Sequence, residues 1–185
     1  MNMDAQKPTL LHQGMKFGLI LGFTQVVIYL LLYAIDKNLL VSFAVGGVMI
    51  VISIVLMVLP ARNYKSLNGG SIDFKEAFLI CLITFAGGAL VTTVFNYVLY
   101  NLIDPSLSEF IKEKAIEKTV TLMEKFSSSQ EDIEKAIAPL QEQDFSQSPA
   151  RLGSQYISSV LFGAIPSLII ALIVRTKNKP LDEIQ

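Results

Sequence analysis

Four long apolar runs, separated by polar segments, dominate the pattern of this chain. The runs cover about residues 14–35, 39–59, 74–100 and 152–174. Each reaches the length of about 20 residues that a helix needs to cross the hydrocarbon core of a bilayer. The connection at residues 104–151 is instead long, polar and helical in composition. The pattern therefore predicts an all-α polytopic membrane protein, a bundle of four transmembrane helices with an extramembrane helical insert between the third and the fourth.

Local signals predict where several of these helices begin and end. Pro60 follows an uncharged run and is expected to end the second helix, because proline lacks the backbone N–H that continues the ladder. Asp73 and Glu76 have the spacing of a capping box at the start of the third helix. Asp104 followed by Pro105 is typical of a helix start and predicts the first helix of the insert.

Small residues recur at four-residue spacing within the apolar runs. Residues four apart lie on one face of a helix, and small side chains there let a second backbone approach closely in lipid. The candidate helix-packing residues are Gly14, Gly18, Gly22, Gly46, Gly88, Ser159, Gly163 and Ser167.

Four polar side chains lie well inside the apolar runs: Gln25, Thr84, Thr92 and Asn96. Gln25 is the most polar of the side chains that lie deep in a run. Such an amide commonly bonds across to a neighbouring helix, which is the interpretation we favour. The alternative is that the four side chains line a cavity of a small-solute channel or transporter.

Composition and charge narrow the classes of function. The chain has 185 residues, of which 52% are hydrophobic and 17% charged, and its formal net charge of −1 gives no reason to expect a nucleic-acid partner. Its one cysteine, Cys81, cannot form an intrachain disulfide. HExxH, CxxC, GxSxG and phosphate-binding-loop patterns do not occur, and the middle of each run lacks charged residues. We therefore expect a protein that is not an enzyme and has no cofactor or metal.

The first predicted helix of the insert has apolar side chains on two opposite faces. One face, expected to lie on the membrane domain or on lipid headgroups, consists of Leu107, Phe110, Ile111, Leu122 and Phe126. The other consists of Ile116, Val120 and Met123, which are candidate contacts for a membrane-protein partner or a second copy of the chain. The alternative is that the helix is an amphipathic segment at the membrane surface.

Basic residues in the short connections predict the orientation, because such connections stay cytoplasmic. Both termini and the second connection are basic, through Lys7, Lys16, Arg62, Lys65, Lys75, Arg175, Lys177 and Lys179. The first connection holds only Lys37, and the insert has more acidic than basic residues. We therefore expect both termini to be cytoplasmic and the insert to lie outside.

Several segments together resemble a known family. They are NGGSIDFKEAF before the third run, NYVLYNLIDP at its end, EFIKEKAIEK in the insert, and the closing basic tail. With the order of the four runs, they are similar to the bacterial domain-of-unknown-function family 4199, small inner-membrane proteins found mainly in the Bacteroidetes lineage. The resemblance covers roughly Lys16 to Lys179. It implies four transmembrane helices in the inner (plasma) membrane and carries no activity.

Two classes of function follow from these observations. The first is a non-enzymatic scaffold or partner subunit that acts through its small-residue faces and its outer insert. The second is the small-solute channel or transporter described above. We favour the first, because helix packing accounts for each of the polar intramembrane residues.

Overall fold

Long helices form from each of the four apolar runs in the computed structural model, which describes residues 9–143 and 145–176. These helices are α1 (Leu10–Ile35), α2 (Phe43–Leu67), α3 (Phe74–Val98) and α6 (Pro149–Val174). Each is long and apolar enough to cross a membrane. Among the described residues there is no strand, so the prediction of an all-α fold with four membrane spans is confirmed.

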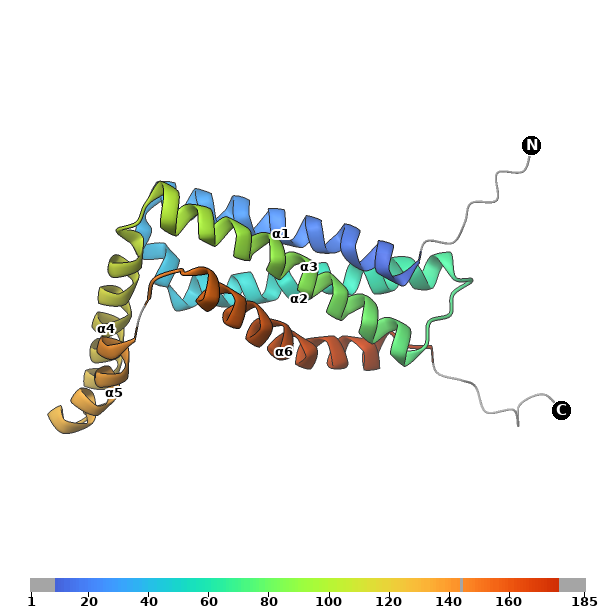
Figure 1. Ribbon diagram of the computed structural model, residues 1–185. Helices are drawn as coiled ribbons and strands as arrows, with labels where there is room; N and C mark the ends of the chain where they lie inside the picture. Colours follow the sequence, from blue (N-terminus) through green and yellow to red (C-terminus); the bar gives the residue numbers. More distant parts are fainter. Residues whose placement is uncertain (1–8, 144, 177–185) are drawn as a thin grey trace.

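Shorter helices make the connections. A 3₁₀ turn, η1 (Lys37–Val41), joins α1 to α2, and a π-helical turn, η2 (Leu99–Ile103), extends α3. The insert contains α4 (Leu107–Lys125) and α5 (Gln130–Glu142). These two helices pack against each other and lie across the end of the bundle that is distant from the start of α1 and the end of α6 (Figure 1). We call the half of the bundle next to them the insert half, and the other the terminal half.

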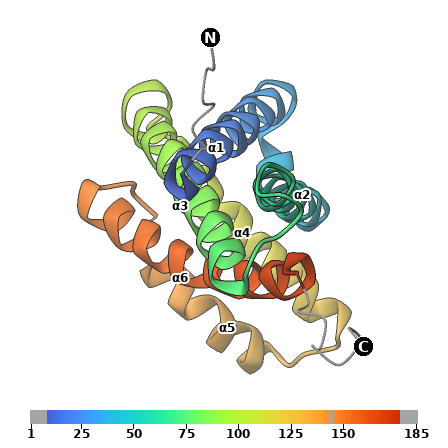
Figure 2. The same ribbon diagram turned by 90° about the vertical axis from the view of Figure 1, so that its right-hand side faces the viewer.

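The α3 helix is the centre of the bundle. It packs along α1 on one side and α6 on the other, while α2 makes smaller contacts with α1, α3 and α6 (Figure 2). Most of the buried core lies in the terminal half, where α2, α3 and α6 meet. This cluster comprises Leu21, Met57, Ala61, Ile72, Ala77, Ile80, Cys81, Ile170, Ala171 and Val174.

The prediction that Pro60 ends the second helix is wrong, because α2 continues through it to Leu67. Met57, Pro60 and Ala61 are all buried. Proline removes one backbone hydrogen bond from a helix. Here the packing of this buried surface against the rest of the terminal half offsets that loss.

The terminal half is also held by polar contacts. Lys65 of α2 donates from Nζ to the carbonyl oxygen of Val174 at 2.9 Å. Asp73 and Glu76 form the predicted capping box at the start of α3, which confirms that prediction. Three of the basic residues used to predict the orientation, Lys7, Lys177 and Lys179, lie outside the described residues.

The start of α4 differs from the prediction. Its N-cap is Ser106, and Pro105 lies before the helix. The Asp104 side chain is not free to act as a cap, because its carboxylate accepts hydrogen bonds from Lys37, Tyr33 and Ser106. A contact between distant parts of the chain therefore takes the place of the local one that the sequence suggested.

Candidate functional site

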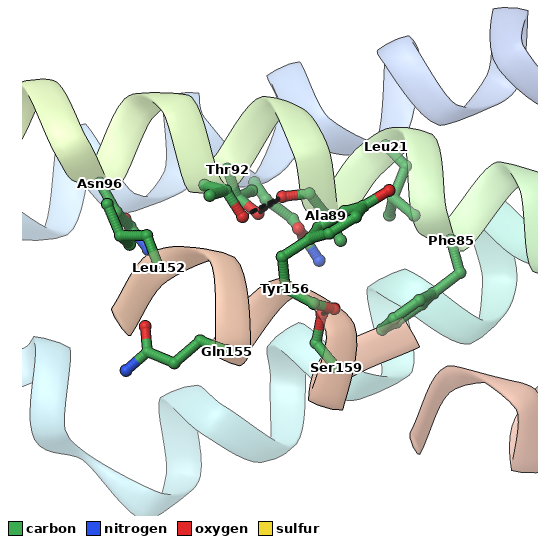
Figure 3. A pocket seen from close by; sticks show the side chains of 11 residues that line it. Leu21, Phe85, Ala89, Thr92, Asn96, Leu152, Gln155, Tyr156 and Ser159 are labelled. Atoms are coloured by element: carbon green, nitrogen blue, oxygen red, sulfur yellow. Dashed lines mark hydrogen bonds between the residues drawn. The ribbon is translucent and has the colours of Figure 1, made fainter. Parts of the chain in front are cut away.

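A polar cavity of about 200 Å³ lies in the insert half, between α1, α3 and α6 (Figure 3). Its lining consists of Leu21, Gln25, Phe85, Ala89, Thr92, Thr93, Asn96, Leu152, Gln155, Tyr156 and Ser159. Asn96 of α3 lies beside Leu152 of α6, and the Tyr156 ring extends towards Ala89. The α3 and α6 helices therefore face each other across a space with amide and hydroxyl groups on its walls.

A second cavity of about 220 Å³ lies on the side of α1 and α3 that faces α2. It shares Gln25, Thr92 and Asn96 with the first. Three of the four polar residues singled out in the sequence are therefore brought together, and each of them lines both of two neighbouring cavities.

Gln25 uses only part of its hydrogen-bonding capacity. Its Nε2 donates to the Ser53 Oγ of α2 at 2.9 Å, and Ser53 in turn donates to the Met49 carbonyl oxygen at 2.7 Å. The amide thus bonds across to a neighbouring helix, as the favoured interpretation expected. Its Oε1 receives no hydrogen bond from the described residues, so this oxygen can accept one from a molecule in the cavity.

Asn96 is the least satisfied of these groups. Its amide is half-buried and makes no hydrogen bond within the part of the chain that the structure describes. Thr92 and Thr93, by contrast, both donate to the Ala89 carbonyl oxygen, at 3.0 and 2.7 Å. An unpaired amide at membrane depth costs several kcal/mol. The cavity is therefore suited to an uncharged group that both donates and accepts hydrogen bonds.

Thr84 lies outside both cavities, contrary to the sequence-based alternative. It is fully buried and donates to the Ile80 carbonyl oxygen at 2.8 Å. A threonine hydroxyl in a helix can be satisfied within the helix in this way. The close approach of α1 at Gly18 leaves no room for a cavity beside Thr84, since a Cβ on Gly18 would lie 2.9 Å from the Thr84 carbonyl oxygen.

Most of the small residues singled out in the sequence are used inside the chain. Gly14, Gly18 and Gly22 face α3, where a Cβ would meet Ile83, Gly87 or Val91 at 3.1 Å or less. Gly88 faces Leu21, and Gly163 faces the Phe85 ring. Ser167 is buried and donates to the Gly163 carbonyl oxygen, while Ser159 lines the cavity and donates to that of Tyr156.

Gly46 is different from these residues. A Cβ there would meet nothing within 4 Å among the described residues, so Gly46 makes no close helix contact within the chain. Gly87, which the sequence analysis did not single out, is buried against Gly18. Counting every fourth residue from Thr84 selects Gly88 and skips Gly87. The Gly87-Gly88 pair in the sequence was the signal that could have identified Gly87.

Sequence reasoning also missed Gln155 and Tyr156 as cavity residues. Both lie near the start of the fourth apolar run. Gln155 is exposed, and Tyr156 donates a long hydrogen bond of 3.4 Å to the Ala86 carbonyl oxygen. Two adjacent polar side chains in an apolar run could have marked them as candidate cavity residues. Only the packing of α6 against α3 places them on the same cavity as Asn96.

Polar contacts close the insert end of the bundle beside these cavities. The Tyr29 and Tyr100 hydroxyls are hydrogen-bonded at 2.8 Å between α1 and η2. Asp104 accepts from Lys37 Nζ at 2.6 Å and from the Tyr33 hydroxyl at 2.9 Å. We call these five residues the insert-end latch. The Lys37 ammonium, with the Ser106 and Tyr33 hydroxyls, holds the pKa of the Asp104 carboxyl well below its usual value, and the same carboxylate raises the pKa of Lys37.

The candidate partner face of α4 is not open in the structure. Ile116, Val120 and Met123 are half-buried. They lie on the side opposite Lys118 and Leu122, which border the start of α2. The packing of α5 on α4 accounts for this partial burial, and the partner face stays a prediction.

Among the described residues, no group of three or more His, Cys, Asp or Glu side chains could hold a metal ion.

Comparison with known protein families identifies a match over most of the chain. A family model described as "Protein of unknown function (DUF4199)" matches residues 16–176. No curated protein matches the chain, and no solved structure matches it.

Proposed function

This chain belongs to the DUF4199 family of proteins of unknown function, and we propose that it acts without catalysis, as a partner subunit within a membrane. The supporting observation is a polar surface within the candidate membrane span α6. Ser154, Gln155 and Ser158 of α6 are exposed beside the cavity, and the Asn96 amide is unpaired within the described residues. Polar groups within a bilayer need a hydrogen-bonding partner, which a transmembrane helix of another subunit can supply.

The test is affinity purification of the tagged protein in mild detergent, with mass spectrometry of what accompanies it. We expect a specific membrane protein to copurify with the wild type and to be lost from a Gln155→Leu/Ser158→Leu variant. Ile173→Ala is the matched control, since Ile173 is 73% exposed on the same helix but lies in the terminal half. Copurification that survives the double substitution would contradict the proposal.

The convergence of Gln25, Thr92 and Asn96 on one cavity favours a second candidate function, the binding or passage of a small uncharged solute. A volume of about 200 Å³ accommodates several water molecules or one small polyol. In this alternative, the free Gln25 Oε1 accepts a hydrogen bond from the solute, and the Asn96 amide both donates and accepts.

Permeability measurements separate the two candidates. Proteoliposomes containing the wild type are mixed rapidly with glycerol or urea, and their swelling is followed by light scattering. The solute function predicts faster swelling than in empty liposomes and a loss of that increase in Asn96→Leu. Thr84→Val is the control, because Thr84 lies outside the cavity. Swelling at the rate of empty liposomes in every sample would rule out the solute function and leave the partner-subunit function as the remaining candidate.

The localisation that accompanies both functions is the inner (plasma) membrane, with both termini cytoplasmic and the insert outside. The basic residues at the end of α2, Arg62 and Lys65, support this orientation, because positive charge next to a span favours the cytoplasmic side. The start of α1, the end of α6 and the second connection share one end of the bundle (Figure 1).

Single cysteines test the orientation. Ser129 and Ser66 are exposed at opposite ends of the bundle, and the native Cys81 is buried. In intact spheroplasts, a membrane-impermeant maleimide should label Ser129→Cys and not Ser66→Cys. Labelling of Ser66→Cys alone would reverse the orientation.

A further inference from the structure

One side of α4 borders the end of a membrane span. A groove of about 410 Å³ separates α4 from the first residues of α2, and its lining includes Phe43, Glu117, Lys118, Leu122 and Lys125. Lys118 Nζ donates to the Val41 carbonyl oxygen at 2.5 Å and lies 5.9 Å from the centre of the Phe43 ring. Phe43 is the first residue of α2 and is 76% exposed. This side of α4 is therefore at the level where the span meets the membrane boundary.

The orientation of α4 and α5 agrees with a position at the membrane boundary. Both α4 and α5 lie across the bundle axis, and they extend beyond the bundle to one side (Figure 1). Because the spans cross the bilayer, helices that lie across their ends run along the membrane surface. The part that extends beyond the bundle has lipid beneath it.

The charges of α4 are sorted around the helix. With about 100° of rotation per residue, Lys114, Lys118 and Lys125 fall on one side of α4. Lys118 and Lys125 border the groove beside Phe43. Glu117 borders this groove too and forms an ion pair with Lys114. Glu113 and Glu124 fall roughly a third of a turn away, and Glu109 nearly half a turn away. The side nearest the membrane therefore has a basic excess, with Lys118 and Lys125 against Glu117, although the insert as a whole is acidic.

Two large apolar side chains accompany these lysines. Leu122 is 46% exposed and Phe126 is 77% exposed. The opposite apolar side of α4, which contains Ile116 and Val120, is half-buried where α5 packs. Packing within the chain therefore accounts for one apolar side of α4 and for Leu107 on the other, and leaves Leu122 and Phe126 uncovered.

We propose that the α4–α5 hairpin is a lipid-binding element that rests on the bilayer surface at the insert end. Leu122 and Phe126 lie at the boundary between headgroups and acyl chains, and Lys118 and Lys125 face the phosphates of anionic lipids. Amphipathic helices bind membranes in this way, through an apolar side and flanking basic residues. The occupant is the headgroup layer, because the charge pattern and the position beside Phe43 both match a membrane surface.

The chain contains no tryptophan, which makes a direct test possible. Full-length Phe126→Trp and Leu122→Trp variants each carry a single tryptophan fluorophore. They are reconstituted into vesicles of phosphatidylcholine with or without phosphatidylglycerol, with part of the phosphatidylcholine brominated on its acyl chains. Glu113→Trp is the control, because Glu113 is exposed on another side of α4.

We expect bromolipid to quench the fluorescence of Phe126→Trp and Leu122→Trp several times more strongly than that of the control variant, and phosphatidylglycerol to increase the difference. Adding Lys118→Glu and Lys125→Glu should remove that increase. Weak bromolipid quenching with strong quenching by iodide in solution would overturn the proposal, because the side would then face water. Weak quenching by both agents, with blue-shifted emission, would overturn it in favour of a contact with a second copy or another protein.

Discussion

Gly18 of α1 and Gly87 of α3 bring two membrane helices into backbone contact. A Cβ placed on Gly18 would lie 3.1 Å from the Gly87 Cα and 2.9 Å from the Thr84 carbonyl oxygen. Both neighbouring atoms belong to the backbone, so no side chain can rotate away to make room. The close approach of α1 to α3 therefore depends on the absence of a single methyl group.

Gly18→Ala should accordingly separate α1 from α3 and reduce the free energy of unfolding by about 1–3 kcal/mol, as overpacking does. Thermal unfolding in detergent, followed by circular dichroism, measures the effect. Gly46→Ala is the matched control, because a Cβ there has open space and alanine favours a helix by up to about 1 kcal/mol. Equal stability of the two variants would show that the close approach does not limit packing.

The hydrogen bond between Tyr29 and Tyr100 should behave as a coupled pair. Tyr29→Phe alone leaves the half-buried Tyr100 hydroxyl without this partner and should cost about 1–3 kcal/mol. The double variant Tyr29→Phe/Tyr100→Phe should be closer to the wild type, since both polar groups are then gone. A double-mutant cycle in thermal unfolding measures the coupling. Additive losses would mean that the two hydroxyls do not depend on each other.

The insert-end latch should make stability depend on acid pH. Because the pKa of Asp104 is lowered in the folded state, its contribution is complete above the unfolded value of about 4 and is lost as the pH falls through the folded pKa. The melting temperature of the wild type should therefore fall in strong acid by more than that of Asp104→Asn, which lacks the titrating group. The two curves should converge at low pH.

The exposed ion pair between Glu131 and Lys135 is the control for this measurement. Its side chains are 76% and 69% exposed, so Glu131→Gln should leave both the melting temperature and its pH dependence unchanged. Parallel pH curves for the wild type and Asp104→Asn would contradict the stabilising role of the latch.

Cys81 should be unreactive in the folded protein. It is fully buried in the terminal half, and its Sγ donates to the Met57 carbonyl oxygen at 3.4 Å. A maleimide in mild detergent should label it only as the protein unfolds, whereas an introduced Ser66→Cys should react at once. Rapid labelling of Cys81 in the native protein would show that α2 separates readily from α3.

The membrane spans were determined by the sequence itself. An uncharged run of about 20 residues is stable across a bilayer as a helix, whatever its neighbours are. The Asp73–Glu76 capping box was equally predictable, because its contacts lie within one turn of the chain. Each of these features depends on local chemistry alone.

Only the tertiary structure decided which residue meets which. Gly18 and Gly46 both belong to small-residue patterns, yet one touches Gly87 and the other is open, because four-residue spacing identifies a helix face but not its neighbour. The α2 helix continues through Pro60, since the burial of this part of α2 in the terminal half outweighs the loss of one backbone hydrogen bond. Asp104 was expected to cap α4, but its carboxylate instead accepts a hydrogen bond from Lys37, 67 positions away. Such choices depend on how helices pack, and that packing is a property of the whole chain.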